Sequence, residues 1–185
     1  MLTKPGFRLE PADILLCVND RTDIFSRIYR GAIGRYEHVS MYIGTFCDIP
    51  MLYESDGRGV VLQNVAHQTG RPVVVMRPLI EWKYKHSVVA TAINIASQDS
   101  SHYDYLAIMH SAIPRVIKEK LPFLPIPSRY IRDDVMICSE ACAETFWRRN
   151  ILVLPKTVIP IPGDFFDSPI LEYAYEGKLM EDIVG

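Results

Sequence analysis

Cys138 is the residue of this sequence whose position best suits it to chemistry. It stands where an apolar, strand-like run that begins at Asp134 gives way to a helical pattern, Cys138-Ser-Glu-Ala-Cys-Ala-Glu-Thr-Phe-Trp147. The first turn of a helix presents unpaired N–H groups and the positive end of the helix dipole, so a thiol there ionises more easily. A thiolate attacks carbonyl carbon atoms, and the same N–H groups can hold the oxyanion that forms. Catalysis by Cys138 then requires a base.

His38 and Glu54 are the candidates for that base and its partner. His38 begins an alternating strand in which His38, Ser40 and Tyr42 share one face. Glu54 lies in a short apolar strand one hairpin later, where a buried carboxylate is unfavourable unless it is paired. An imidazole on the neighbouring strand would pair with it, and the carboxylate would fix the tautomer of the histidine and raise its basicity. We therefore expect the two side chains to meet.

Simpler interpretations exist for each of these residues. A single cysteine on a helix is more often a small buried hydrophobic residue than a nucleophile, and an isolated histidine on a strand is often only half-exposed. Cys142 shares a helical face with Cys138, which would suit a pair of metal ligands, but His102 and His110 are not spaced to complete the site. We expect Cys142 to pack in the core and the protein to need no metal or organic cofactor.

The elements that must position these residues follow from the hydrophobic pattern. An apolar run and several alternating runs predict strands, and apolar spacing of three and four residues predicts helices. An Asp56-Gly57 pair is typical of a hairpin turn, so the middle of the chain is predicted to be an antiparallel meander. The fold class is therefore α+β. The expected strands are 12–18, 38–43, 51–55, 60–65 and 73–76, and the expected helices are 22–30, 88–96, 105–113 and the one that begins at Cys138.

Length and composition indicate one ordinary globular domain, residues 1–185. Apolar residues make up 49% of the chain and charged residues 23%, which argues against long disorder. The net charge of −2 predicts no general attraction to nucleic acid or to anionic membranes. We expect a cytoplasmic protein, because the sequence begins without a signal-like segment, has no apolar run near the ~20 residues of a membrane span, and has only four scattered cysteines.

The order of several short motifs along the chain carries a resemblance. The motifs are Ala12-Asp13-Ile-Leu-Leu, Glu37-His38-Val-Ser-Met-Tyr-Ile-Gly44, Leu52-Tyr-Glu54, Tyr103-Asp104 and Cys138-Ser-Glu140. In this order they resemble the permuted papain-like amidases, in particular the YaeF/YiiX branch of the NlpC-type cysteine hydrolases, which are related to lecithin:retinol acyltransferase. The resemblance extends from about Pro11 to Pro169.

The resemblance implies a circularly permuted papain-like fold, in which an antiparallel sheet or small barrel packs against helices and the histidine strand precedes the nucleophile helix. The catalytic residues that it implies are Cys138, His38 and Glu54, and the substrate-binding candidates are Tyr103, Asp104 and Tyr42. Ala12 replaces the glycine usual in the family, and Ser40 stands where a small residue is common. These departures bear on the subfamily and the substrate.

The expected function is that of a cysteine hydrolase that cleaves a peptide or amino-acid amide bond through an acyl-enzyme. Two alternatives remain open: a lipid acyltransferase or thioesterase of the lecithin:retinol acyltransferase type, and a non-catalytic binding module on the same fold. The expected partner is a peptide, an amino-acid amide or another acyl substrate. Membrane contact is not favoured.

Liposome co-sedimentation separates the amidase from the lipid enzyme. A lipid enzyme needs an exposed apolar surface beside basic groups, and the loop Leu121-Pro-Phe-Leu-Pro-Ile-Pro127 follows three basic residues between 115 and 120. We predict that this loop is mostly buried, that the cleft is polar and short, and that liposome binding is weak. Strong, salt-sensitive binding that is lost when Phe123 and Leu124 are changed to Ser, with the fold retained, would favour the lipid enzyme instead.

Overall fold

The structure is a computed structural model that describes residues 6–19, 34–56, 59–98, 137–156, 160–179 and 183. These residues form a mixed α+β fold around one six-stranded antiparallel sheet. The strands are β1 (Ile14–Val18), β2 (Tyr36–Phe46), β3 (Ile49–Asp56), β4 (Gly59–Asn64), β5 (Pro72–Pro78) and β6 (Leu171–Lys178). The α+β class expected from the sequence is thus confirmed. The expected helices at 22–30 and 105–113, Tyr103, Asp104 and the 121–127 loop lie outside the described residues.

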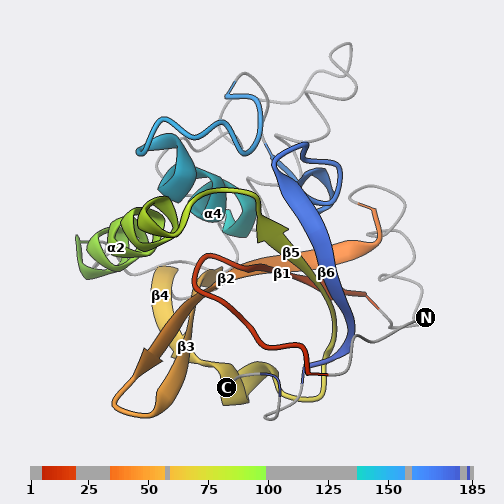
Figure 1. Cartoon of the computed structure of the whole chain (residues 1–185). Helices are drawn as coiled ribbons and strands as arrows, with labels where there is room; N and C mark the ends of the chain where they lie inside the picture. The colour runs from red at the N-terminus through yellow and green to blue at the C-terminus, as the bar shows by residue number, and fades with distance from the viewer. Residues whose placement is uncertain are drawn as a thin grey trace, which may run out of the picture.

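Two α-helices of the described chain lie on one side of the sheet (Figure 1). They are α2 (Trp82–Gln98) and α4 (Cys138–Trp147), and two short 3-10 helices, η1 (Val65–Gln68) and η3 (Pro162–Phe165), complete the described elements. Helix α4 packs on β2 and β3, and α2 packs on α4. None of the described helices is both long and apolar enough to span a bilayer.

The strand order is β4-β3-β2-β1-β5-β6. Strands β2, β3 and β4 form the predicted meander, but β5 does not continue it. Instead, β5 pairs with β1, with Ile14 opposite Met76, and β6 adds to the far edge of β5. The predicted meander is thus confirmed for β2, β3 and β4 but does not extend to β5, because the local pattern identifies a strand but not its partner. The strand at β6 was not predicted.

Tight turns join the strands of the meander. Cys47 and Asp48, between β2 and β3, have φ angles of 50° and 63°. Two successive left-handed residues make the turn whose twist matches that of a hairpin. At the next hairpin, Asp56 of β3 is opposite Gly59 of β4, as the Asp56-Gly57 pair predicts. Residues 57 and 58 lie outside the described residues. The turn at Cys47 and Asp48 joins β2 directly to β3 and sets these two strands side by side.

Alternation divides the buried side chains of the sheet between two clusters. The cluster shared with α2 and α4, here the helix-side cluster, includes Val39, Met41 and Tyr53 together with Phe146 of α4. The cluster on the other face, here the far-side cluster, consists of Leu9, Leu15, Cys17, Tyr42, Leu52, Val65, Val73, Val75, Leu179 and Ile183. Because side chains of a strand point alternately to opposite faces, β1 and β5 are buried on both faces, which explains their almost continuous apolar sequence.

Ser40 is an exception among the buried polar groups. Its side chain is fully buried on β2, opposite Glu54, and its hydroxyl has no hydrogen-bond partner within the described part of the chain. Ser168 is also buried, but its hydroxyl donates to the carbonyl oxygen of Val153 over 2.6 Å. An unsatisfied buried hydroxyl is unfavourable, whereas loss of a satisfied one leaves its acceptor without a partner.

Replacing these two serines by alanine should therefore have opposite consequences. We expect Ser168→Ala to lower the free energy of unfolding by about 1–3 kcal/mol, and Ser40→Ala to change it by less than about 0.5 kcal/mol or to raise it. Urea unfolding followed by circular dichroism measures both. An equal loss of stability in the two variants would show that the Ser40 hydroxyl is satisfied in solution.

Candidate active site

Cys138 is the first residue of α4, and its thiol lies against the backbone of β2. Ile137 has an extended conformation, with φ −74° and ψ 163°, and its N–H donates to the Glu140 carboxylate over 3.1 Å. That contact is the acidic half of a capping box and explains why the helix begins at this residue. Cys138 is half-buried, and the nearby backbone N–H groups of Val39 and Ser139 lower the pKa of its thiol. These two donors favour a negative charge on the sulfur.

His38 and Glu54 meet, as predicted, across the strands β2 and β3. Glu54 is opposite Ser40 in the register, so His38, two residues before Ser40, lies diagonally across from it on the same face. The His38 Nε2 and Glu54 Oε2 atoms are 2.8 Å apart. The carboxylate is nearly inaccessible, with 3% of its side chain exposed, whereas His38 is 19% exposed. Because Nε2 is engaged with Glu54, Nδ1 is the nitrogen left for Cys138.

The thiol of Cys138 and the imidazole of His38 lie close enough to shift each other's pKa. Burial alone would raise the pKa of Cys138, but the nearby His38 and the two N–H donors outweigh it and lower the pKa below its usual value. Burial would lower the pKa of His38, but the Cys138 sulfur and the Glu54 carboxylate outweigh it and raise the pKa well above the usual value. Both directions favour a thiolate beside an imidazolium.

Gln68, at the end of η1, is a member of this cluster that sequence analysis missed. Its Nε2 donates to Glu54 Oε2, and its Oε1 accepts from the Cys17 sulfur over 3.2 Å. The residue is only 3% exposed. A glutamine in a 3-10 turn follows no strand or helix period, so no pattern placed it near Glu54. The available signal was the Asn64 cap, whose side-chain oxygen accepts from the Ala66 N–H at 2.8 Å and starts the turn.

Two further predicted residues lie in the interior. Cys142 is fully buried in the helix-side cluster, as expected. Tyr42, a substrate-binding candidate, is 3% exposed, packs in the far-side cluster, and shares a 3.1 Å hydrogen bond with the Thr45 hydroxyl. This placement corrects the expectation for Tyr42, because a tyrosine enclosed by core side chains packs the sheet and does not present its ring to a substrate.

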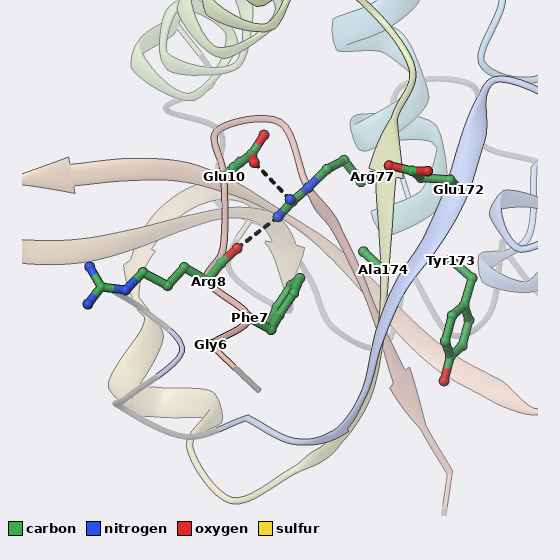
Figure 2. Close-up of a pocket in the computed structure, with 8 residues that line it drawn as sticks. All are labelled: Gly6, Phe7, Arg8, Glu10, Arg77, Glu172, Tyr173 and Ala174. Atoms are coloured by element: carbon green, nitrogen blue, oxygen red, sulfur yellow. Dashed lines mark hydrogen bonds and ion pairs between the residues drawn. The ribbon is translucent and has the colours of Figure 1, made fainter. Parts of the chain in front are cut away.

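A pocket of about 340 Å³ lies elsewhere, between the N-terminal segment and the strands β5 and β6 (Figure 2). Its wall includes Phe7, Arg8, Arg77 and Tyr173 and none of the three proposed catalytic residues. The Arg77 guanidinium lies over the Phe7 ring, 5.3 Å from its centroid. The pocket therefore belongs to the packing of the N-terminal segment on the sheet edge.

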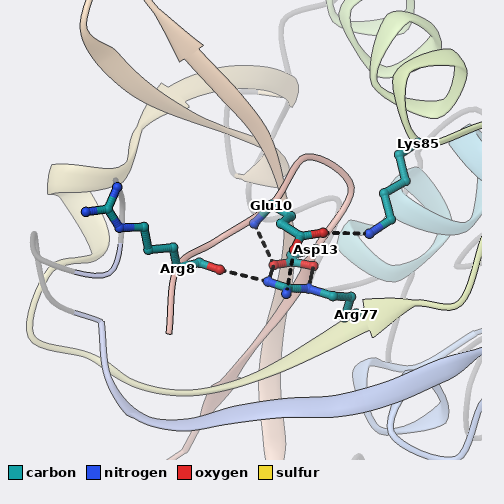
Figure 3. A network of polar contacts seen from close by, with 5 residues as sticks. All are labelled: Arg8, Glu10, Asp13, Arg77 and Lys85. Atoms are coloured by element: carbon teal, nitrogen blue, oxygen red, sulfur yellow. Dashed lines mark hydrogen bonds and ion pairs between the residues drawn. The ribbon is translucent and has the colours of Figure 1, made fainter. Parts of the chain in front are cut away.

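The charged groups beside this pocket are paired with one another (Figure 3). Arg77 donates to both carboxylate oxygens of Asp13, at 2.9 and 2.8 Å, to Glu10 at 2.7 Å and to the Arg8 carbonyl at 2.8 Å. Lys85 at the start of α2 donates to the other oxygen of Glu10 over 2.8 Å. Burial raises the pKa of Asp13 despite the opposing effect of Arg77. This network fastens the segment before β1 to β5 and α2.

Comparison with known proteins identifies a similar fold. No protein-family model and no curated protein matches the sequence. The solved structure of the metalloprotein YiiX from Escherichia coli O157:H7 superposes with a TM-score of 0.64 and 15% sequence identity. The superposition covers 94% of this chain and 100% of the YiiX chain. At this identity the similarity establishes the fold alone.

YiiX is described as a metalloprotein. Within the described residues, no group of three or more His, Cys, Asp or Glu side chains is arranged to hold a metal ion. Cys138 and His38 contact each other, and Glu54 is shared between His38 and Gln68.

The pKa directions predict how the reactivity of Cys138 depends on pH. The thiolate–imidazolium pair exists above the lowered pKa of Cys138 and below the raised pKa of His38. The rate of alkylation by iodoacetamide should therefore rise with pH through a midpoint below the pKa of about 8.5 of a free thiol. Cys17 and Cys142 should label slowly because they are buried. Mass spectrometry of the labelled peptides measures each rate.

His38→Ala should move the midpoint for Cys138 upward and lower its rate at pH 7 by about tenfold or more. His86→Ala is the matched control, because His86 is an exposed histidine on α2 that packs against the Trp82 ring. An unchanged rate in His38→Ala would remove His38 from this role.

Proposed function

We propose that this protein is a cysteine hydrolase that cleaves an amide bond of a peptide or an amino-acid amide through an acyl-enzyme. Cys138 is the nucleophile, His38 the general acid and base, and Glu54 the residue that orients His38. The observation that carries the proposal is the proximity of the Cys138 thiol, at the start of α4, to an imidazole whose Nε2 is bonded to a buried carboxylate. This combination provides an activated nucleophile together with its base.

In the proposed reaction, the Cys138 thiolate attacks the carbonyl carbon and the carbonyl π electrons move to the oxygen. The backbone N–H of Cys138, in the first turn of α4, stabilises the resulting oxyanion. Collapse of this intermediate breaks the C–N bond, and the His38 imidazolium gives its proton to the departing amine. A thioester between the acyl group and Cys138 remains.

Hydrolysis of the thioester reverses the roles. His38, now neutral, removes a proton from a water molecule as the water attacks the acyl carbon. The C–S bond then breaks, the carboxylic acid leaves, and the proton held by His38 is again shared with the Cys138 sulfur. Glu54 keeps Nε2 of His38 engaged throughout, so Nδ1 carries the proton to and from the reacting atoms.

We also propose that the fold is a circularly permuted papain-like fold. The strand with His38 precedes the helix with Cys138 in the chain, which is the order of the circularly permuted members. The helix that begins with the cysteine packs on the strands that carry the histidine and the glutamate, and this arrangement supports the assignment. The proposed substrate contacts Tyr103 and Asp104 lie outside the described residues.

Trapping the acyl-enzyme tests the proposal. The protein is exposed to a panel of activated peptide amides, amino-acid amides and long-chain acyl esters, quenched in acid and analysed by mass spectrometry. We expect an acyl adduct on Cys138 with the amides, none in Cys138→Ala, and an unchanged yield in Cys47→Ser, which alters the exposed cysteine of the β2–β3 turn.

Two other outcomes of this experiment would redirect the assignment. An adduct that forms with the long-chain esters alone would favour a lipid acyltransferase or thioesterase. No adduct with any member of the panel, from a protein whose Cys138 is nevertheless rapidly alkylated, would favour a binding module with an unused site.

A further inference from the structure

Gln68 connects Glu54 to a cysteine that the proposed reaction does not use. The Gln68 Nε2 donates to Oε2 of Glu54 over 2.5 Å, and the same oxygen is bonded to Nε2 of His38 at 2.8 Å. On its other side, Oε1 of Gln68 accepts from the Cys17 sulfur over 3.2 Å. One carboxylate oxygen is therefore held by two donors, one from β2 and one from η1.

The surroundings of Gln68 determine the orientation of its side-chain amide. Gln68 is 3% exposed and lies beside Val65 of η1, which packs with Leu15 and Leu52 in the far-side cluster. An amide without partners is unfavourable in such a place, so both ends of the side chain must be satisfied. Turning the amide by 180° would set its carbonyl oxygen against the Glu54 carboxylate. The contacts thus favour one orientation of the amide.

Cys17 favours the same orientation. Burial raises the pKa of the Cys17 thiol, even though His38 opposes this, so the sulfur keeps its proton. A protonated thiol is a donor, and the oxygen of the amide is the end that can accept from it. Cys17 is opposite His38 in the pairing of β1 with β2, so the sheet register keeps the donor in place.

We infer that Gln68 is a positioning residue for the hydrolysis proposed above, and that Cys17 fixes the orientation of its amide. Gln68 holds Oε2 of Glu54 against His38, which keeps Nδ1 of the imidazole directed at Cys138. Without this donor, a carboxylate in an apolar cluster would turn toward water or take up a proton, and either change weakens its bond to His38. The inference rests on the proposed function.

Alkylation of Cys138 by iodoacetamide at a series of pH values tests this role without a known substrate. All variants carry Cys47→Ser to remove the exposed cysteine. We expect Gln68→Leu to raise the midpoint of the pH profile by about one unit, which means about tenfold slower labelling below the midpoint. Gln98→Leu, the same change at an exposed position of α2, should leave the profile unchanged.

Gln68→Glu distinguishes positioning from simple packing, because it keeps the size of the side chain. At low pH the introduced carboxyl carries a proton and can donate to Glu54 as the amide does. As the pH rises it ionises, repels Glu54 and disfavours the thiolate. The labelling rate relative to the unsubstituted protein should therefore fall as the pH rises, whereas the ratio for Gln68→Leu should stay constant below the midpoint.

A second pair of variants tests the part played by Cys17. Cys17→Ser keeps a donor for the Gln68 oxygen and should leave the profile of Cys138 nearly unchanged. Cys17→Ala removes the donor and should shift the profile in the direction of Gln68→Leu, by a smaller amount. Equal profiles for the serine and alanine variants would overturn the role of Cys17.

The failures of the two proposals are distinguishable. If Cys138 of the unsubstituted protein labels like a free thiol, the proposed function falls and this inference falls with it. If Cys138 is activated but folded Gln68→Leu shows the same profile, the inference alone is overturned. Should Gln68→Leu fail to fold, Gln68→Glu decides, and a rate ratio independent of pH would overturn the inference.

Discussion

The arrangement of the candidate site depends on a carboxylate that the sheet removes from water. Glu54 has 3% of its side chain exposed, and an isolated carboxylate in such surroundings would be strongly unfavourable. Its pairing with His38 and Gln68 offsets that loss of hydration. Since both partners bind the same oxygen, their positions are coupled. The Glu54 carboxylate thus determines the orientation of the His38 imidazole. The imidazole in turn lowers the pKa of the Cys138 thiol.

The sheet register makes this pairing available. Strand β2 is central to it, because β1 brings Cys17 opposite His38 and β3 brings Glu54 opposite Ser40. The network around Arg77 fastens the segment before β1 to β5 and α2. The pairings of β2 with its two neighbours therefore position His38 and Glu54, and the ion-pair network holds the segment that precedes β1.

The sequence predicted those parts of the site that local periodicity governs. Alternation placed His38 on a half-buried strand, the apolar context of Glu54 required a partner, and the helical pattern began at Cys138. Gln68 was not predicted because a 3-10 turn has no distinguishing sequence period. The pairing of β5 with β1 was not predicted because strand partners depend on contacts between segments that are distant in the sequence. Tyr42 was misjudged because a strand buried on both faces encloses a side chain that alternation alone would allow to face a cleft.

A comparison of Cys138 with Cys142 shows why the reactive state belongs to the assembled fold. Both residues lie on α4, and burial raises the pKa of each thiol. For Cys142 burial prevails, the nearby Cys138 and Glu54 add to it, and the pKa stands well above its usual value. For Cys138, the first-turn position, the β2 backbone and His38 reverse the direction. One turn of helix thus separates a thiol whose pKa is raised from one whose pKa is lowered, and the surroundings of the helix start account for the difference.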